Sequence, residues 1–157
     1  MSIIRLAVSE DAGKIVELSK GLTVDRSSKE KSGFVEYKPL TMEEVARRIS
    51  KNPFFYIAEE DSLLTGFFSN FSDEKLKDTS YYPDWFSEKL LQNSKPFIYS
   101  DQLGVSKEFQ GRNVGPRLIR KLFQDLQDTD YKAVWATTSH KPYINLPTKL
   151  HCCIYGT

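Results

Sequence analysis

The segment from Phe97 to Leu126 restricts the fold more than any other part of the sequence. Residues 97–105 are expected to form a strand, which passes through a short polar turn. Apolar side chains at Leu118, Leu122 and Leu126 then recur on one helix face, and basic residues occupy the other side. A strand that leads directly into an amphipathic helix is typical of a domain in which helices cover a sheet.

Further strand-like and helix-like segments surround this unit. Strands are expected over residues 3–8, 54–58, 63–71 and 132–138. Helices are expected after Ser9, which would be the N-cap, after Thr41, from Asn113 to Leu126 and over residues 143–155. The strands 54–58 and 63–71 should form an antiparallel hairpin, and Thr41 with Glu44 matches a capping box. This order predicts a single mixed α/β domain over residues 1–157, with helices flanking a mixed sheet.

The composition excludes several classes of protein. Lys and Arg number 22 and Asp and Glu 21, so the net charge of +1 excludes a globally basic nucleic-acid binder. No apolar run reaches the ~20 residues of a transmembrane helix, so we expect no membrane partner. The start of the chain lacks the pattern of a secretory signal, and Cys152 and Cys153 are adjacent. We therefore expect a cytoplasmic protein without a disulfide framework or a metal site.

The turn between the strand and the helix has the features of an anion site. Its sequence is Gln110-Gly111-Arg112-Asn113-Val114-Gly115. Such a turn places backbone N–H groups at a helix N-terminus, where unpaired donors and the helix dipole favour an anion. The Walker and the G-x-G-x-x-G patterns are absent, which disfavours a P-loop or a Rossmann site. A capped strand–helix junction without a ligand is the alternative interpretation.

Together with the order of the elements, this turn resembles the signature of the GNAT superfamily of N-acetyltransferases: Gln or Arg, two residues, Gly, one residue, then Gly or Ala. The resemblance extends from the first expected strand to the fourth main helix. It implies acetyl-CoA as co-substrate, with its pyrophosphate on residues 110–115 and its pantetheine beside Leu103, Gly104 and Val105. Backbone N–H groups there would hold the acetyl carbonyl. Asn145 matches the family's cofactor-contacting Asn.

Two residues depart from the family pattern in the turn. Asn113 stands where the family usually has Gly, and Pro116 has no N–H to give to a phosphate oxygen. The lost donor would weaken acetyl-CoA binding by the contribution of one hydrogen bond to a charged group, about 1.5–3 kcal/mol. Pro at the first helical position nevertheless suits the helix itself.

The resemblance also suggests a proton acceptor. Attack of an amine on a thioester needs a neutral amine, and in many relatives a carboxylate on the fourth strand takes its proton. Asp101 is the candidate, because period-two spacing puts it on the strand face of Leu103 and Val105. A structural role at an exposed strand end is the alternative.

The expected general acid is less regular. The family often has a Tyr seven residues after the helix Asn, but counting from Asn145 reaches Cys152. A thiol can donate a proton in principle, since its unperturbed pKa is about 8.5. A buried packing role is the alternative for Cys152, and Tyr143 and Tyr155 are the alternative acids.

The end of the chain predicts an open sheet edge. The family normally continues with two more strands after a Gly equivalent to Gly156, and this sequence ends at Thr157. The strand at 132–138 would then have an unpaired edge. Because exposed edges pair readily with other chains, a homodimer through this edge is one expectation, and a truncated, less stable product is the alternative.

The sequence therefore predicts an acetyl-CoA-dependent N-acetyltransferase that acts on a primary amine of a small molecule or a peptide. Residues of the long connections 23–40 and 72–96 would contact the acceptor: Phe34, Tyr37, Tyr81 and Tyr82. The alternative is a non-catalytic acyl-CoA-binding or protein-interaction module. The departures in the turn, the missing Tyr and the missing strands favour that alternative.

Overall fold

A computed structural model describes residues 2–24, 34–35, 40–76, 88, 91–92, 96–138 and 151–156. Its elements are β1 (Ile3–Leu6), α1 (Ala12–Leu22), β2 (Thr23–Val24), β3 (Phe34–Val35), α2 (Met42–Lys51), β4 (Tyr56–Glu60), β5 (Leu63–Ser72), β6 (Phe97–Val105), α4 (Val114–Leu126), β7 (Ala133–Thr138) and β8 (His151–Gly156). Short 3-10 turns, η1 (Ser9–Asp11) and η3 (Lys107–Phe109), precede α1 and α4. Among these residues, no helix has the length and apolar character needed to cross a bilayer.

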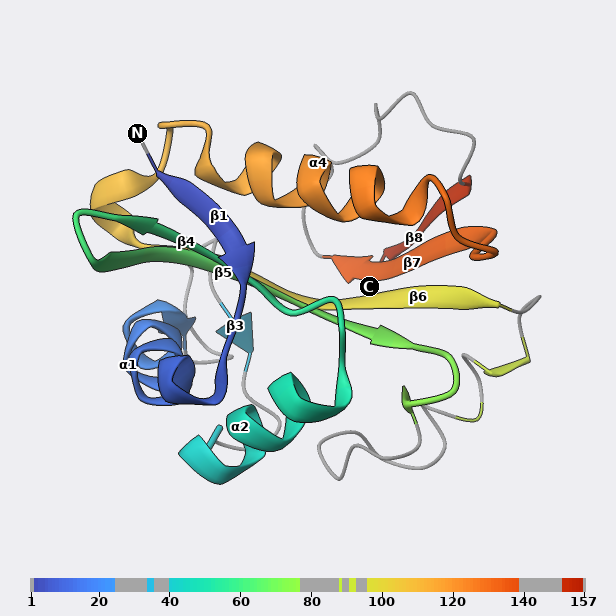
Figure 1. Cartoon of the computed structure of the whole chain (residues 1–157), viewed down its shortest axis with the longest axis horizontal. Helices are drawn as coiled ribbons and strands as arrows, with labels where there is room; N and C mark the ends of the chain where they lie inside the picture. The colour runs from blue at the N-terminus through green and yellow to red at the C-terminus, as the bar shows by residue number, and fades with distance from the viewer. Residues whose placement is uncertain are drawn as a thin grey trace.

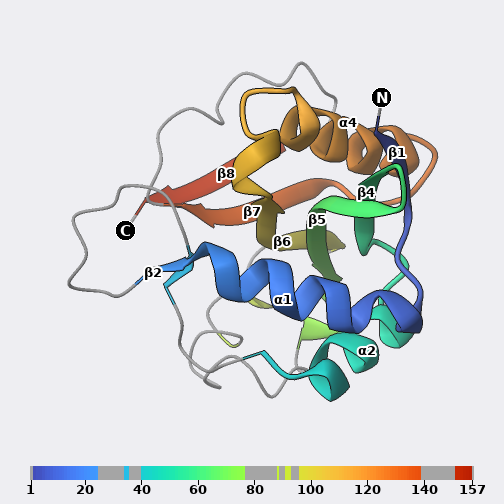
Figure 2. The ribbon, with the colours of Figure 1, turned by 90° about the vertical axis from the view of Figure 1, so that its left-hand side faces the viewer.

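One mixed sheet organises the fold. Its six strands follow the order β1-β4-β5-β6-β7-β8. In this sheet β1, β4, β5 and β6 pair antiparallel, whereas β6, β7 and β8 pair parallel. Helix α4 covers one face of the sheet, and α1 and α2 cover the other (Figure 1 and Figure 2). The predicted fold class, a mixed sheet flanked by helices, is confirmed.

Each face of the sheet buries its own apolar cluster. Along β4, Tyr56 and Ala58 pack toward α4, whereas Ile57 packs toward α1 and α2. Helix α4 contributes the buried side chains Val114, Leu118, Leu122, Phe123 and Leu126. The apolar stripe that the sequence predicts on this helix is therefore the face that it packs on the sheet.

One local prediction is confirmed in part and one in full. The Thr41 hydroxyl accepts the N–H of Glu44 at 3.2 Å and caps α2, which begins at Met42. The reciprocal half of the capping box is not formed, because the Glu44 carboxylate accepts from Arg47 and Arg48 instead. β4 and β5 form the predicted antiparallel hairpin, with Tyr56 opposite Phe68. Both features depend on residues close together in the chain.

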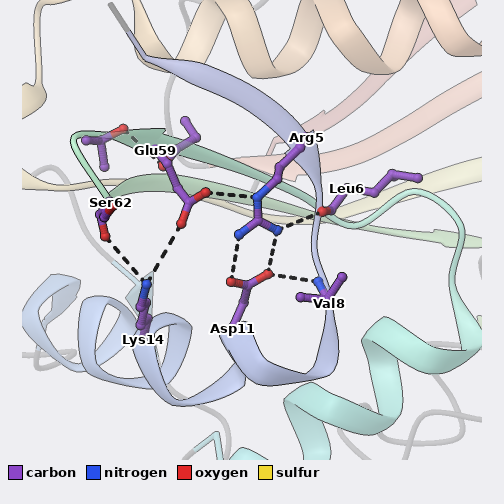
Figure 3. A network of polar contacts seen from close by, with 9 residues as sticks. Arg5, Leu6, Val8, Asp11, Lys14, Glu59 and Ser62 are labelled. Carbon is purple, nitrogen blue, oxygen red and sulfur yellow. Dashed lines mark hydrogen bonds and ion pairs between the residues drawn. The ribbon is translucent and has the colours of Figure 1, made fainter.

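A polar network fastens β1 to the start of α1 and to β4 (Figure 3). The Arg5 guanidinium donates to both carboxylate oxygens of Asp11, at 2.8 and 3.0 Å, and to Glu59 at 2.8 Å. Asp11 also accepts the N–H of Val8 at 2.8 Å. The prediction of Ser9 as the helix cap is wrong, since Ser9 lies within η1 and the Asp11 carboxylate takes the free backbone N–H instead.

The C-terminal segment differs from the prediction. Residues 151–156, expected within a helix over 143–155, form β8, which pairs in parallel with all of β7. The Cys-Cys-Ile-Tyr sequence suits a strand. The prediction used helical spacing alone and did not consider that the backbone edge of β7 could pair with this segment. The expected open edge at 132–138 is therefore wrong, and the homodimer expected through that edge loses its basis.

Candidate cofactor site and active site

The sheet opens between β6 and β7. These strands pair only from Phe97 opposite Ala133 to Ser100 opposite Ala136, whereas β6 continues to Val105. On its other side, β6 stays paired with β5 as far as Val105. Within the described part of the chain, the backbone beyond Ser100 therefore has no neighbouring strand on the β7 side.

The backbone N–H groups of Leu103 and Val105 face this open side. Successive residues of a strand direct their backbone groups to opposite sides, and the N–H of Ser106 donates to the Thr65 carbonyl of β5 at 2.9 Å. Leu103 and Val105 consequently direct theirs away from β5. In agreement, the Val105 carbonyl accepts the side-chain amide of Gln110 at 3.1 Å.

The start of α4 presents a second set of backbone donors. Gly111 has φ +78° and Asn113 has φ +64°, left-handed conformations that turn the chain sharply into the helix. The N–H of Arg117 donates to the Asn113 carbonyl at 3.3 Å, so the N–H groups of Asn113, Val114 and Gly115 precede the helical ladder. The Asn113 side chain does not cap them. A helix start of this kind favours an anion.

Both departures from the family pattern have a local explanation. Asn tolerates the left-handed conformation better than most residues, so Asn113 can replace the usual Gly. Pro116 is the third residue of α4, because the helix begins at Val114, so its expected place at the first position is wrong. The position still lies in the first turn, where an N–H would have no helical partner, so the helix loses no hydrogen bond.

Arg112 adds positive charge beside the turn. Its side chain is exposed, its guanidinium lies 5.0 Å from the centre of the Phe109 ring, and its backbone N–H donates to the Phe109 carbonyl at 3.3 Å. Arg117, in contrast, donates to the Ser2 carbonyl at 2.6 Å and so anchors the N-terminal segment to α4. Arg112 is therefore the basic side chain placed at the turn itself.

Close packing joins the two sets of donors. A Cβ on Gly66 would lie 2.9 Å from the Gly104 carbonyl oxygen, so only glycine fits there without displacement. A Cβ on Gly115 would lie 3.6 Å from Val105 and 3.7 Å from Leu103. The end of β6 and the start of α4 are thus in direct contact.

Asp101 lies at a β-bulge. The register between β5 and β6 shifts between Ser69 and Asn70, and Asp101 is the residue of β6 left without a partner. Leu103 and Val105 pack toward α4, whereas the Asp101 carboxylate contacts α2 on the opposite face. The prediction that the three residues share one face is wrong, because period-two spacing does not hold across a bulge.

The Asp101 carboxylate is buried and paired with Arg48 of α2. Arg48 Nη1 donates to Asp101 Oδ2 at 2.8 Å, and the two side chains are 2% and 0% exposed. Arg48 Nε donates to Glu44 at 3.0 Å, and the guanidinium lies 5.2 Å from the centre of the Phe71 ring. Burial raises the pKa of Asp101 above its usual value, although the Arg48 charge opposes the rise.

The remaining predicted site residues are only partly described. Phe34 belongs to β3, which pairs in parallel with β2, and Cys152 lies in β8 opposite Val134. Four others lie outside the described residues: Tyr37, Tyr81, Tyr82 and Asn145. The structure thus brings residues 103–105 together with 110–115, whereas the roles of the other residues stay predictions.

Sequence reasoning missed Arg48. It lies three residues after Val45, on the side of α2 that is buried against the sheet. A charged residue on the apolar face of an expected helix needs a partner, because burying an unpaired charge is costly. The spacing of Val45 and Arg48 was therefore a usable signal, although it does not identify Asp101 as the partner.

Comparison with known proteins identifies the fold. The family model of the acetyltransferase (GNAT) family matches residues 23–150. The loading GNATL domain of CurA from Lyngbya majuscula has a TM-score of 0.63 at 19% identity, over 94% of this chain and 69% of that one. An acetyltransferase from Vibrio fischeri has a TM-score of 0.56 at 21% identity, over 85% of this chain and 93% of that one.

A third similar structure contains CoA. The aminoglycoside N-acetyltransferase AAC(6')-Iy, solved with CoA, has a TM-score of 0.58 at 14% identity, over 88% of this chain and 78% of that one. The curated protein sequences give no match. Since the family model covers most of the chain, from β2 past the end of β7, the protein belongs to the GNAT acetyltransferase family.

Proposed function

We propose that this protein is an acetyl-CoA-dependent N-acetyltransferase, which transfers an acetyl group to a primary amine by direct attack. The observation that carries the proposal is the packing of two segments whose backbone donors have no partner among the described residues. One set of donors is on the open side of β6 at Leu103 and Val105, and the other is at the start of α4, where Gly115 packs on both strand residues. A thioester joined to a pyrophosphate matches this pair of sites.

In this proposal, the pyrophosphate binds the turn and the pantetheine lies along the open side of β6. The N–H groups at the start of α4 and the Arg112 charge favour the phosphates. The pantetheine amides can pair with β6 much as a neighbouring strand would. The proposed cofactor contacts are Leu103, Gly104, Val105, Gln110, Gly111, Arg112, Asn113, Val114, Gly115 and Asn145.

The acetyl transfer then proceeds through a tetrahedral intermediate. The neutral amine nitrogen attacks the thioester carbonyl carbon, and the carbonyl oxygen, now an oxyanion, is held by the N–H groups of Leu103 and Val105. The carbonyl re-forms, the C–S bond breaks, and CoA leaves as a thiol after it gains a proton. The nitrogen loses one proton, which gives the acetamide. We assign the donor of the thiol proton to Cys152, on the spacing from Asn145 alone.

We propose that Asp101 accepts the amine proton through a bridging water. Its carboxylate is sealed from solvent and lies on the α2 side of the sheet, about 7 Å along the strand from Leu103. This distance is too long for the carboxylate to contact an amine at the open edge directly. Its Oδ1 has no hydrogen-bond partner among the described residues, so this oxygen can accept a bond from water.

The acceptor belongs to the class of small-molecule or peptide amines, with Phe34, Tyr37, Tyr81 and Tyr82 as its proposed contacts. We propose a cytoplasmic location, since the adjacent cysteines Cys152 and Cys153 cannot join distant segments by disulfides. Neither a nucleic acid nor a membrane is part of the proposal.

The test has two stages. Acetyl-CoA is titrated into the protein by calorimetry, and the release of CoA thiol is then followed with a panel of amines. Micromolar binding with turnover of at least one amine is the expected result. Binding without turnover on any amine would favour the non-catalytic acyl-CoA-binding module. An absence of binding at millimolar acetyl-CoA would overturn the proposal.

A further inference from the structure

A chain of charges runs from α2 into the bulge of β6. Arg48 binds Glu44 at 3.0 Å and Asp101 at 2.8 Å, and both bonds are largely shielded from solvent. We infer that Arg48 is a positioning residue of the proposed reaction, which fixes the Asp101 carboxylate through Oδ2 and leaves Oδ1 available for the amine proton. The inference rests on the proposed N-acetyltransferase function.

The geometry restricts both side chains. Separate nitrogens of Arg48 bind Glu44 and Asp101, and its guanidinium packs over the Phe71 ring. The planar guanidinium can hold this geometry, whereas the compact ammonium of a lysine cannot reproduce all of these contacts. Among the described residues, Arg48 alone donates to the Asp101 carboxylate, through Oδ2, so the orientation of the carboxylate depends on Arg48.

Three buried oxygen atoms gather at the bulge without hydrogen-bond partners among the described residues. They are Asp101 Oδ1, Ser69 Oγ and Gln102 Oε1. Ser69 and Gln102 are paired across β5 and β6 beside Asp101, and the Ser69 hydroxyl faces the carboxylate without meeting hydrogen-bond geometry. Buried polar atoms in native proteins are usually satisfied by protein or water. A water or an amine is therefore the expected donor at this place.

The charge balance around Asp101 depends on α2. Burial raises the pKa of Asp101, Arg48 opposes the rise, and the more distant Glu44 adds to it. The charged groups described on neighbouring elements bind elsewhere: Lys14 to Glu59, Glu17 to Lys20, and Glu60 to Ser2. β5 and β7 contain no charged residue. Arg48 is thus the cation that keeps the pKa of Asp101 from rising further.

The chain supplies a matched control. Arg47 also donates to Glu44, at 2.7 and 3.0 Å, but its side chain is 32% exposed. It makes no bond to Asp101, whose bound oxygen is taken by Arg48. Replacing Arg47 removes one neighbouring positive charge and leaves the pair Arg48–Asp101 in place.

The experiment follows the titration of Asp101 directly and through catalysis. The Asp101 carboxyl carbon is observed by NMR, with Asp101→Asn to assign the signal, in the intact protein and in Arg48→Met, Arg48→Lys, Glu44→Gln and Arg47→Met. The pH profile of kcat/KM is measured on the same proteins. If the Asp101 pKa rises by about one unit, the ionised fraction on the acid limb falls about tenfold.

We expect Arg48→Met to raise the Asp101 pKa and to move the acid limb to higher pH. Glu44→Gln should move both to lower pH, because it removes a nearby negative charge. Arg48→Lys should keep the pKa close to that of the parent protein but lower kcat, since the charge stays and the orientation is lost. Arg47→Met should change neither quantity.

An unchanged Asp101 titration in Arg48→Met, or an equal shift in Arg47→Met, would overturn the inference. So would an acid limb that stays fixed while the Asp101 signal moves. If Arg48→Met does not fold, the opposite shift in Glu44→Gln and the kcat loss in Arg48→Lys decide the question. Failure of the proposed function is a separate result: the parent protein would bind no acetyl-CoA or acetylate no amine, whatever Asp101 does in the NMR titration.

Discussion

Replacing Gly115 by Asp should weaken acetyl-CoA binding through charge, while the added Cβ fits without a clash. A Cβ at this position would meet Val105 at 3.6 Å and Leu103 at 3.7 Å, which are ordinary van der Waals distances. The residue lies in the first turn of α4, so a side chain meets no backbone strain. An acidic residue near a helix N-terminus stabilises the helix by about 0.3–1 kcal/mol. Because Gly115 is buried and its Cβ would point at Val105 and Leu103, desolvation of the carboxylate opposes this gain, so the stability of the variant is measured together with its affinity.

The loss of affinity follows from charge repulsion at the turn. Two negative unit charges 4 Å apart repel by about 1 kcal/mol in water and about 4 kcal/mol near a protein surface. Each 1.4 kcal/mol changes a dissociation constant about tenfold. Because the turn is exposed at Gly111 and Arg112 but buried at Gly115, a value between these limits applies. We expect the Kd for acetyl-CoA to rise by about 10- to 100-fold.

Calorimetric titration measures this change, with Gly115→Asn as the control of equal shape and no charge. The difference between the Asp and Asn variants isolates the electrostatic part, and it should shrink when the salt is raised to about 1 M. Thermal unfolding of both variants checks the fold. Equal affinities for the two variants, or an Asp variant that binds as tightly as the parent, would refute phosphate binding at the start of α4.

Two other predictions concern the framework of the site. Gly66→Ala forces a Cβ to 2.9 Å from the Gly104 carbonyl, so urea denaturation should show a loss of about 1–3 kcal/mol and calorimetry a weaker binding of acetyl-CoA. Burial raises the pKa of Asp11, but hydrogen bonds from Arg5 and Val8 outweigh it and hold the pKa below its usual value. Asp11→Asn should therefore cost about 1–2 kcal/mol at neutral pH, since Arg5 is partly solvated, and the loss should vanish as the pH falls through the Asp11 pKa. A loss of equal size at neutral and acid pH would contradict that assignment.

The predictions that succeeded depend on local sequence. The Thr41 cap, the hairpin of β4 and β5, and the buried stripe of α4 all follow from residues within a few positions of one another. The strand at 151–156 failed because its partner, β7, lies outside that range. A short segment can show helical spacing of its apolar residues and still form a strand, because it pairs with a free strand edge.

The same division holds for the site. The turn of residues 110–115 was found because its glycine positions and the helix that follows are contiguous, and Asn113 has the left-handed conformation that this turn needs. The Arg48–Asp101 pair joins residues 53 positions apart, and each residue by itself has an ordinary surface role as the simpler interpretation. Only the packing of α2 on the sheet makes the two side chains partners.

The bulge at Asp101 lies between the open side of β6 and the buried Arg48–Asp101 pair. Up to Asp101 the strand alternates regularly: Ile98 packs toward α4, whereas Tyr99 packs beside Phe71 on the opposite face, where Asp101 meets Arg48. The extra residue reverses the alternation after Asp101, so Leu103 and Val105 pack toward α4. Bulges also bend a strand and increase its twist, and the pairing of β6 with β7 ends at Ser100, the residue before the bulge. One extra residue therefore accounts both for the opening beside β6 and for the opposite faces on which Asp101 and Leu103 lie.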